Sequence, residues 1–237
     1  LVTRAVVVAD TLPPIITLQG DAIITMAAGD DFTDPGSSAN DSFEGPLTPG
    51  VTGTVNTSIP GIYTLSYNVS DSAGNAAIEV TRAINVVDLT APLIALNGPL
   101  SMDHEAGSPY KDAGTIATDN VDGTMTVTTT GSVDVSTPGM YILTYTAIDT
   151  AGNEATPATR TVVVADTIAP VITLLGSAEM DVLFNAPFTD PGATVRDSFE
   201  SGLMTTVTGS VDTTTAGVYT LTYNVSDSAG NAAAEVS

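Results

Sequence analysis

The sequence contains no cysteine, which excludes disulfide bonds, thiol catalysis and cysteine-based zinc sites. It also contains no tryptophan, and aromatic residues make up only 5% of the chain. No apolar run approaches the roughly 18 residues that a membrane helix needs. A small domain without disulfides is stabilised by its core, its neighbours or a bound metal, so these are the features to look for.

Basic residues are scarce as well. The 237 residues include 5 Lys+Arg against 27 Asp+Glu, which gives a formal net charge of −22. A protein that binds phosphate backbones needs clustered Lys and Arg, so nucleic acid is excluded as a partner. The same charge disfavours docking onto anionic lipid, and we predict no membrane insertion. It favours solubility and the binding of counter-cations.

Catalytic bases are almost absent. His104 is the only histidine and lies in a loop-like stretch, residues 103–105, so we interpret it as a surface residue. A hydrolytic triad needs a base, and no glycine-rich phosphate loop or zinc-ligand spacing occurs. Paired carboxylates recur along the whole chain, which suits a structural role better than a glycosidase cleft. We predict that the protein is not an enzyme.

The sequence does contain a strict internal repeat. Asp10, Asp88 and Asp166 recur every 78 residues (88 − 10, 166 − 88), with no insertion or deletion. The same interval relates several further sets of identical residues, namely Pro14, Pro92 and Pro170; Gly20, Gly98 and Gly176; Tyr63, Tyr141 and Tyr219; and Asn75, Asn153 and Asn231. Such periodicity indicates a tandem array of one structural unit.

Each repeat has the pattern of short strands separated by turns. In the first, apolar residues alternate with polar ones from Tyr63 to Val69, which predicts a strand with one buried face. A turn-rich stretch at 71–75 follows, and then a strand over 82–87. Residues 15–18 and 22–26 predict earlier strands. About seven short strands in roughly 78 residues are typical of a Greek-key sandwich.

The tyrosine of the repeat indicates a particular sandwich. Pro60, Gly61 and Tyr63 precede Leu65 as in the strand of immunoglobulin domains that begins with a tyrosine corner. Four segments resemble bacterial immunoglobulin-like repeats, the hyalin-repeat-like modules also found in insecticidal crystal proteins and large surface adhesins: Asp166-Thr-Ile-Ala-Pro-Val-Ile-Thr-Leu, Phe188-Thr-Asp-Pro-Gly-Ala, Gly217-Val-Tyr-Thr-Leu-Thr-Tyr and Asp227-Ser-Ala-Gly-Asn. The resemblance covers the whole chain, implies a spacer or adhesive module, and carries no catalytic residues.

We therefore predict an all-β protein of three tandem immunoglobulin-like Greek-key sandwiches in an elongated rod. The predicted domains are residues 10–87, 88–165 and 166–237. Residues 1–9 align with the closing strand of a repeat, and the third repeat ends before that strand. Two explanations remain open, a window cut from a longer covalent array or donation of residues 4–9 to the third repeat of the next subunit. The donated residues would be Arg4, Ala5, Val6, Val7, Val8 and Ala9. If the first nine residues lay unpaired in solvent, away from any sheet, the filament interpretation would fail.

Two further sets of repeated residues have predicted roles. Arg4, Arg82 and Arg160 begin the last strand on the same face as core valines, so we expect a packed stem and a head group that reaches a carboxylate or a tyrosine ring. Asp34, Asp112 and Asp190 are interpreted as turn formers at the other end of each domain, away from the linker.

Acidic residues gather at equivalent loops of every repeat. In an immunoglobulin sandwich the linker, the B–C loop and the F–G turn share one end, so four carboxylates should converge there. Oxygen ligands in loops are those that Ca²⁺ prefers, and Asn75, Asn153 and Asn231 could add to them. The alternative is that these acids cap turns and face water. The candidate calcium ligands are Asp10, Asp41, Glu44 and Asp71; Asp88, Asp119, Asp122 and Asp149; and Asp166, Asp197, Glu200 and Asp227.

The leading functional hypothesis is a structural segment of an extracellular or cell-surface filament or adhesin stalk. Its partners would be copies of itself, head to tail, or further repeats of the same chain. The runner-up is an array that binds a ligand or carbohydrate, although few aromatic residues are available for such a site. A third option is an accessory region of an enzyme.

Overall fold

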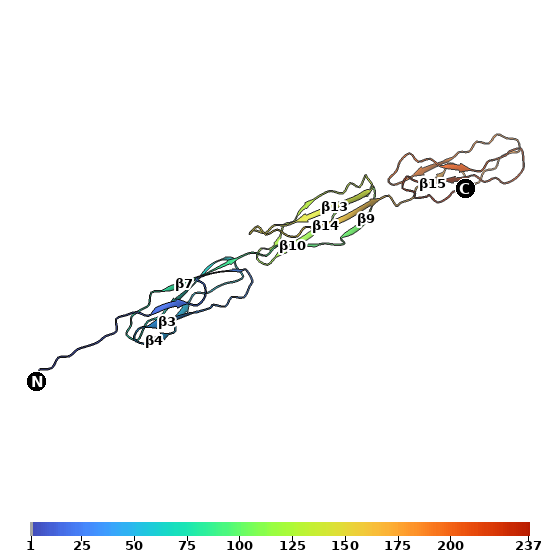
Figure 1. The fold of residues 1–237 in the computed structure, drawn as a ribbon. Helices are drawn as coiled ribbons and strands as arrows, with labels where there is room; N and C mark the ends of the chain where they lie inside the picture. Colours follow the sequence, from blue (N-terminus) through green and yellow to red (C-terminus); the bar gives the residue numbers. More distant parts are fainter. Residues whose placement is uncertain (1) are drawn as a thin grey trace. The chain divides into compact units, whose positions relative to one another are not determined.

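A computed structural model describes residues 2–237, and within them every regular element is a β-strand (Figure 1). None of these residues forms a helix with the length and hydropathy needed to cross a bilayer. The chain divides into two compact units. Unit 1 contains the residues up to Ala95 together with Ile116–Val127 and Thr146–Pro157, and unit 2 contains Leu96–Thr115, Thr128–Tyr145 and Ala158–Ser237.

The first repeat forms two sheets of unit 1. One has the strand order β1-β3-β4 and the other β2-β7-β6-β5, with β2 parallel to β7 and the remaining pairs antiparallel. The bounds are β1 Ile15–Leu18, β2 Ile23–Ala27, β3 Ser37–Asp41, β4 Gly45–Leu47, β5 Gly50–Thr52, β6 Gly61–Asn68 and β7 Val80–Val87. The predicted strands are confirmed, and the seven strands make an all-β sandwich.

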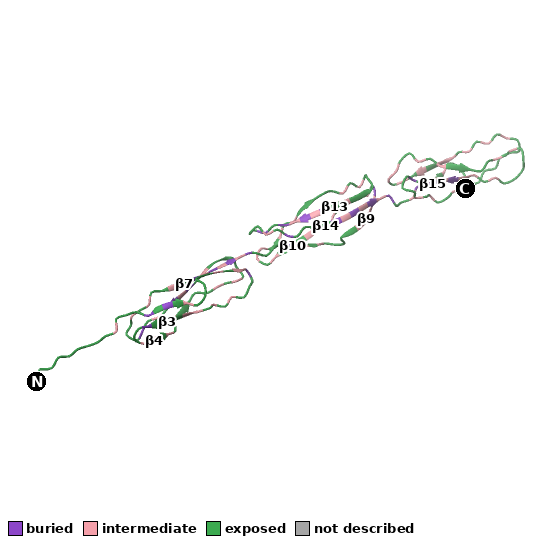
Figure 2. Ribbon diagram, in the orientation of Figure 1, coloured by how far each residue is buried: buried purple, intermediate pink, exposed green. Residues whose placement is uncertain are grey.

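The core of this sandwich comes from alternate residues of the strands. In β7, Ile84 and Val86 are buried, as are Leu65 and Tyr67 in β6, and they pack in one cluster with Ile16 of β1. Figure 2 colours the buried residues of the chain purple. Both sheets therefore contribute to one core, as the period of two in the sequence predicts.

A buried arginine network lies beside this core. Arg82 has no exposed surface, forms an ion pair with Asp34, and donates from Nε to the carbonyl oxygen of Asp21 at 3.0 Å. Its guanidinium carbon lies 5.6 Å from the ring centroid of Tyr67, whose hydroxyl donates to Asp34 at 2.7 Å. The head group thus reaches both a carboxylate and a tyrosine ring, which confirms the expectation for Arg82.

Asp34 has more than the turn-forming role predicted for it. Its Oδ1 accepts a hydrogen bond from Gly36 N at 3.1 Å, so it does form a turn, but it also binds Arg82 and Tyr67. Burial alone would raise the pKa of Asp34, yet the hydrogen bonds of Tyr67 and Gly36 and the charge of Arg82 lower it. Burial and the adjacent Asp34 raise the pKa of Tyr67 to about 12.

The tyrosine corner is present in all three repeats. The hydroxyls of Tyr63, Tyr141 and Tyr219 donate to carbonyl oxygens four residues upstream, at 2.9, 2.6 and 2.8 Å. This is the hydrogen bond that fixes the start of the corresponding strand in immunoglobulin domains, and its prediction from the sequence is confirmed.

The second repeat contributes strands to both units. Its first sheet has the order β8-β10-β11, and its second has the order β9-β14-β13-β12. The bounds are β8 Leu93–Leu96, β9 Ser101–Glu105, β10 Thr115–Asp119, β11 Gly123–Met125, β12 Thr128–Thr130, β13 Gly139–Thr146 and β14 Ala158–Ala165. The buried arginine recurs here, because Arg160 binds Asp112 and lies over Tyr145.

One sequence interpretation in this repeat is wrong. Residues 103–105 are not a loop, because they belong to β9, which pairs in parallel with β14. His104 is half-buried there, with Nε2 3.0 Å from the carbonyl oxygen of Ser108 and its ring edge-on to Tyr110. The sequence did not predict this strand because its inner face carries Met102 and His104, so the usual alternation of aliphatic and polar residues is absent.

The third repeat has fewer strands than the predicted seven. It contains β15 Val171–Leu174, β16 Ala193–Arg196, β17 Thr206–Thr208 and β18 Thr222–Asn224, paired as β15-β16 and β17-β18. Residues 179–183, equivalent to β9, form no strand. In the second repeat β9 pairs only with Thr161–Ala165 of β14. In the third repeat Val236 forms a bridge to Tyr223 where the equivalent strand would begin, and no described residue takes the place of Thr161–Ala165. Phe184 is consequently 66% exposed, whereas the equivalent Ala106 is 2% exposed.

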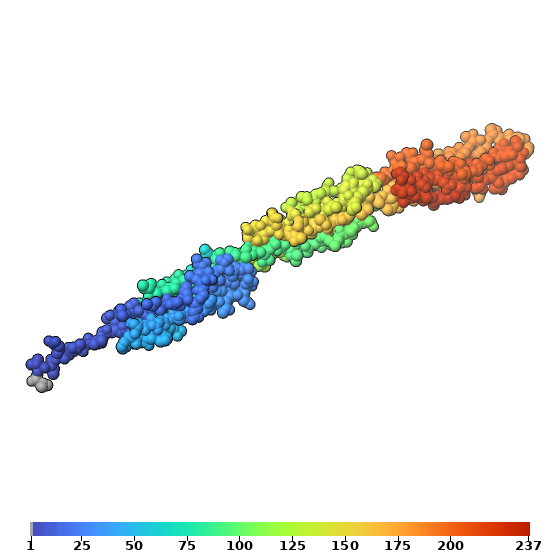
Figure 3. Space-filling model, in the orientation of Figure 1, coloured from blue at the N-terminus to red at the C-terminus, as the bar shows by residue number. Residues whose placement is uncertain are grey.

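The N-terminal segment forms no strand. Residues 2–9 are exposed, with Val6, Val7 and Val8 77%, 87% and 93% accessible, and the segment is dark blue in Figure 3. Within the described part of a single chain, these residues pair with no sheet. This is the arrangement that weighs against a filament, unless the segment pairs with a second molecule.

Candidate metal centre

The linker and the β3–β4 turn each place one aspartate at the same end of the first sandwich. Asp41 Oδ1 accepts hydrogen bonds from the backbone N–H groups of Phe43 and Glu44, at 2.7 and 3.0 Å. Asp10 Oδ1 accepts one from Leu12 N at 3.1 Å. These local turns hold the carboxylates in place and explain why aspartate occupies both positions. The second oxygen of each, Oδ2, is buried and has no hydrogen-bond donor among the described residues.

A third aspartate comes from the turn between β6 and β7. Asp71 accepts hydrogen bonds from Asn75, from its backbone N to Oδ1 and from Nδ2 to Oδ2, both at 2.7 Å. Asn75 Nδ2 also donates to the carbonyl oxygen of Asp10 at 3.3 Å, which ties this turn to the linker. Asp10, Asp41 and Asp71 each offer a carboxylate oxygen within 4.8 Å of the others, and we call these residues the first acidic cluster.

Glu44 was predicted as a calcium ligand, but its side chain binds a neighbouring turn. Its Oε1 accepts hydrogen bonds from the backbone N of Ser72, at 2.7 Å, and from the Ser72 hydroxyl. It joins the β3–β4 turn to the β6–β7 turn and lies outside the group of three mutually close oxygens. Glu200 makes the equivalent contact, accepting from Ser228 N at 2.7 Å.

The second acidic cluster has a different composition. It consists of Asp88, Asp119 and Asp122, whose oxygens lie within 4.8 Å of one another. Asp122 also accepts hydrogen bonds from Thr150 N and Oγ1, at 2.7 and 2.9 Å. Asp149, predicted as a ligand, lies outside this group, and both of its oxygens accept from Asn153 at 2.7 Å.

The same local turns recur in the second repeat. Asp88 Oδ1 accepts from Thr90 N at 3.1 Å, and Asp119 Oδ1 accepts from Val121 N at 2.7 Å. Their Oδ2 atoms are again buried without a donor among residues 2–237.

The third repeat has Asp166, Asp197 and Asp227 at the equivalent positions, but they are not among the described carboxylates whose oxygens lie within 4.8 Å of one another. The Oδ2 atoms of Asp166 and Asp197 are buried without a donor in the described chain. Burial raises the pKa of Asp166, and the charges of Asp197, Asp227 and Glu105 raise it further, against the hydrogen bond from Ile168 N. These carboxylates are therefore close enough to repel one another.

Glu105 is a member of this environment that the sequence analysis missed. It also accepts a hydrogen bond from Thr167 N at 3.1 Å. Only the parallel register of β9 and β14, which places Glu105 opposite Ala165, brings it next to Asp166. The sequence offers no signal for this, because the equivalent residues of the other repeats are Ala27 and Leu183.

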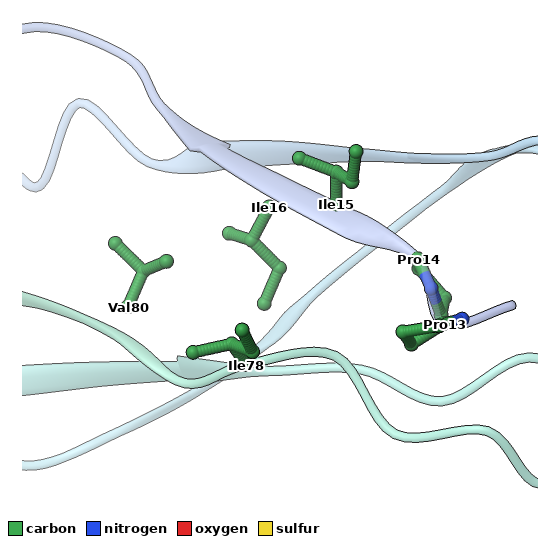
Figure 4. A pocket seen from close by; sticks show the side chains of 6 residues that line it. All are labelled: Pro13, Pro14, Ile15, Ile16, Ile78 and Val80. Atoms are coloured by element: carbon green, nitrogen blue, oxygen red, sulfur yellow. The ribbon is translucent and has the colours of Figure 1, made fainter.

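An apolar depression in the first repeat has a different character. It has a volume of about 160 Å³ and is lined by Pro13, Pro14, Ile15, Ile16, Ile78 and Val80. Figure 4 shows it between β1 and the segment that carries Ile78 and Val80. Its lining carries no titratable or hydrogen-bonding side chain, so it offers no chemistry beyond apolar contact.

A family model described as "Bacterial surface protein, Ig-like domain" matches residues 16–86, 94–164 and 172–236. The chain is 29% identical to a hyalin of Lytechinus variegatus over 260 residues, which cover 98% of this chain and 47% of that protein. It is 28% identical to a hyalin of Strongylocentrotus purpuratus over 240 residues, covering 94% of this chain and 20% of that protein. The chain thus spans about half of the first relative and a fifth of the second.

Among solved structures, a lipoprotein of Bacteroides thetaiotaomicron aligns over 92% of this chain and 96% of its own. The identity is 15% and the TM-score 0.30, a likeness too low to inform either the fold or the function.

Proposed function

The chain belongs to the family of bacterial surface protein Ig-like domains, and from this membership we propose that it is a structural segment of an extracellular filament or adhesin stalk. The observation that carries the proposal is the unbroken 78-residue repeat, matched three times by one family model. A tandem array of one module adds length with each copy, and each copy contacts only its neighbours. The proposal places the protein at the cell surface and gives it no catalytic role.

We propose further that segments are joined by strand donation, in which residues 4–9 of one molecule complete the third repeat of the next. Arg4, Val6 and Val8 stand one repeat before Arg82, Ile84 and Val86, which are at most 1% exposed. In a single chain, Val6 and Val8 remain in solvent. An apolar strand with alternating core residues is what an incomplete sandwich would accept.

The third repeat retains the acceptors for the donated arginine. Tyr223 donates to Asp190 at 2.5 Å, as Tyr67 and Tyr145 do to Asp34 and Asp112. In the first two repeats the arginine joins this pair, whereas no described residue does so in the third. Arg4 carries the missing group, so its head would bind Asp190 and lie over the ring of Tyr223.

The second repeat predicts the register of the donated strand. Thr161 of β14 lies opposite Ile142 of β13, which makes Ala5 the partner of Thr220 in the proposed contact. Side chains directly opposite in an antiparallel pair have Cβ atoms about 5 Å apart, close to disulfide distance. Because the chain has no cysteine, an engineered pair reports on this contact alone.

The experiment uses the variant Ala5→Cys/Thr220→Cys under mild oxidation. We expect a ladder of covalent multimers in steps of 24.0 kDa on a denaturing gel. Adding Arg4→Ala should weaken the ladder. The control Ala5→Cys/Thr222→Cys shifts the register by two residues and should give little cross-linking. A ladder of equal strength in the control, or none in the test variant, overturns strand donation.

A second measurement separates strand donation from a longer covalent array. Native material is denatured and its mass determined. A mass near 24.0 kDa supports separate molecules joined by donated strands, and a much larger mass supports further repeats in the same chain. Either result is compatible with a stalk. A chain that binds a ligand or carbohydrate while forming no extended assembly would instead support the adhesin alternative.

A further inference from the structure

We propose that the linker end of each repeat holds a Ca²⁺ ion, bound by the aspartate of the linker and the first aspartate of the β3–β4 turn or its equivalent. The paired residues are Asp10 and Asp41, Asp88 and Asp119, and Asp166 and Asp197. Asp71 completes the first site and Asp122 the second. This goes beyond the proposed stalk and does not depend on strand donation.

The buried oxygens without a donor carry the inference. Asp41 is 2% exposed, Asp88 9% and Asp166 7%, yet each retains a carboxylate oxygen that no described group approaches as a donor. A buried polar atom without a partner is expensive, and a buried charge much more so. Six of the seven buried side-chain atoms without a partner are these aspartate oxygens, two in every repeat. Turn capping uses only the other oxygen of each residue and leaves this feature unexplained.

The charge at these sites is not balanced by the protein. The ion pairs found among residues 2–237 are Arg82–Asp34 and Arg160–Asp112, both in the arginine networks. At neutral pH the acidic clusters therefore hold several carboxylates and no basic partner. A cation from solution is the remaining source of positive charge.

The geometry suits calcium. Ca²⁺ binds oxygen at about 2.3–2.6 Å, so two ligands of one ion lie at most about 5 Å apart. The first and second acidic clusters offer three oxygens within 4.8 Å of one another. Mg²⁺ binds at about 2.0–2.1 Å in strict octahedral geometry, keeps several waters and usually takes one or two carboxylates, which fits a site of three carboxylates less well. The remaining Ca²⁺ ligands would be water and backbone carbonyl groups.

Ion binding would also order the contact between successive repeats. In unit 1, the turn that begins at Asp119 carries Asn120, whose Nδ2 donates to the carbonyl oxygen of Ala28 at 3.3 Å. The next residue, Val121, packs on the core of the first repeat. In unit 2, Phe199 follows Asp197 in the equivalent turn and packs on the cluster that contains Ala106. A cation that fixes Asp119 or Asp197 therefore fixes the side chains that hold two repeats together.

The test compares the full chain in CaCl₂, in MgCl₂, and in NaCl with chelator at matched ionic strength. Thermal unfolding and calorimetric titration are the measurements. With Ca²⁺ at about a hundred times its Kd, we expect the Tm to rise by about 10 °C, because the ion binds only the folded state. We expect a smaller rise with Mg²⁺ and none with NaCl. An unchanged Tm without binding heat, or an equal rise with Mg²⁺, overturns the calcium site.

Matched variants then assign the site. Asp41→Asn, Asp119→Asn and Asp197→Asn keep an acceptor for the turn but remove the charge, so the triple variant should fold and lose the Ca²⁺-dependent rise. In chelator its Tm should equal or exceed that of the wild type, because carboxylate repulsion is relieved. The exposed Asp31→Asn serves as control and should retain the full response. A triple variant that keeps the response overturns the assignment, whatever the outcome of the strand-donation experiment.

Discussion

The guanidinium of Arg160 has no exposed surface and forms an ion pair with the carboxylate of Asp112. The same pair is made by Arg82 and Asp34 in the first repeat. In both repeats the arginine also donates to backbone carbonyl groups, Pro99 O at 3.2 Å for Arg160 and Asp21 O at 3.0 Å for Arg82. In each repeat one buried arginine side chain thus binds segments that lie far apart in the sequence.

Replacing this arginine should strongly destabilise the folded protein. Arg160→Met removes one partner of a buried pair. Asp112 then keeps the hydrogen bond of Tyr145 alone, and the carbonyl groups of Asn97, Pro99 and Gly114 lose the donors of the arginine. We therefore expect a loss of about 3 kcal/mol in the free energy of unfolding. Urea unfolding followed by circular dichroism measures it. Arg196→Met, at an exposed residue, should change the same quantity by less than about 0.5 kcal/mol. Equal losses in the two variants would contradict the role assigned to the network.

The arginine networks also predict a response to alkaline pH. The pKa of both Tyr67 and Tyr145 is about 12 in the folded protein, against an ordinary value of 10.0. A raised pKa contributes stability that is fully present below pH 10.0 and is lost as pH rises toward 12. We therefore expect the free energy of unfolding to fall within this window. The variant Tyr67→Phe/Tyr145→Phe should show a smaller decrease in the free energy of unfolding over this pH range. The same pH dependence in the variant and the wild type would contradict the role of these tyrosines.

Two phenylalanines in identical turns should differ in their effect. Phe199 packs against the cluster that includes Val162 and Val164, whereas Phe43 is 80% exposed. Phe199→Ala should therefore destabilise the chain by about 1–3 kcal/mol, and Phe43→Ala by less than about 0.5 kcal/mol. Thermal unfolding of the two variants side by side checks this. A larger effect at Phe43 would be inconsistent with the contacts described.

One glycine is required by close backbone approach. Gly131 has φ 91°, and a Cβ at this position would overlap the carbonyl oxygen of Ile142. Gly152 has a similar φ of 93° but nothing within 4 Å of its Cβ position. Gly152→Ala carries only the penalty of the left-handed conformation, about 1 kcal/mol, and Gly131→Ala should cost clearly more. Unfolding free energies within error of each other would refute the steric argument.

Features with a short repeating pattern could be predicted from the sequence. The family resemblance and the all-β fold are confirmed, and the strand with Tyr63 and Leu65 was visible from its period of two. The burial of Arg82 followed from its place on the core face of β7. Its partner Asp34 was seen only as a turn former, because the local spacing to Gly36 is visible in the sequence and a contact across 48 residues is not.

The candidate metal centre was also predicted only in part. The convergence of Asp10, Asp41 and Asp71 was expected from the topology of an immunoglobulin sandwich. Glu44 and Asp122 occupy equivalent positions, and both accept a hydrogen bond from the β6–β7 turn or its equivalent. Only Asp122 also has an oxygen close to the other carboxylates, a difference that depends on side-chain length. The predicted domain boundaries and the calcium ligands remain predictions, because only binding and folding experiments test them.

Imaging native material shows whether this chain acts as a structural segment outside the cell. Cells that produce the protein are labelled with antibody against residues 10–87 and viewed by electron microscopy. The proposal predicts label at regular intervals along thin fibres or stalks that project from the surface. Label confined to the cell interior, or scattered over a surface without such structures, would contradict it.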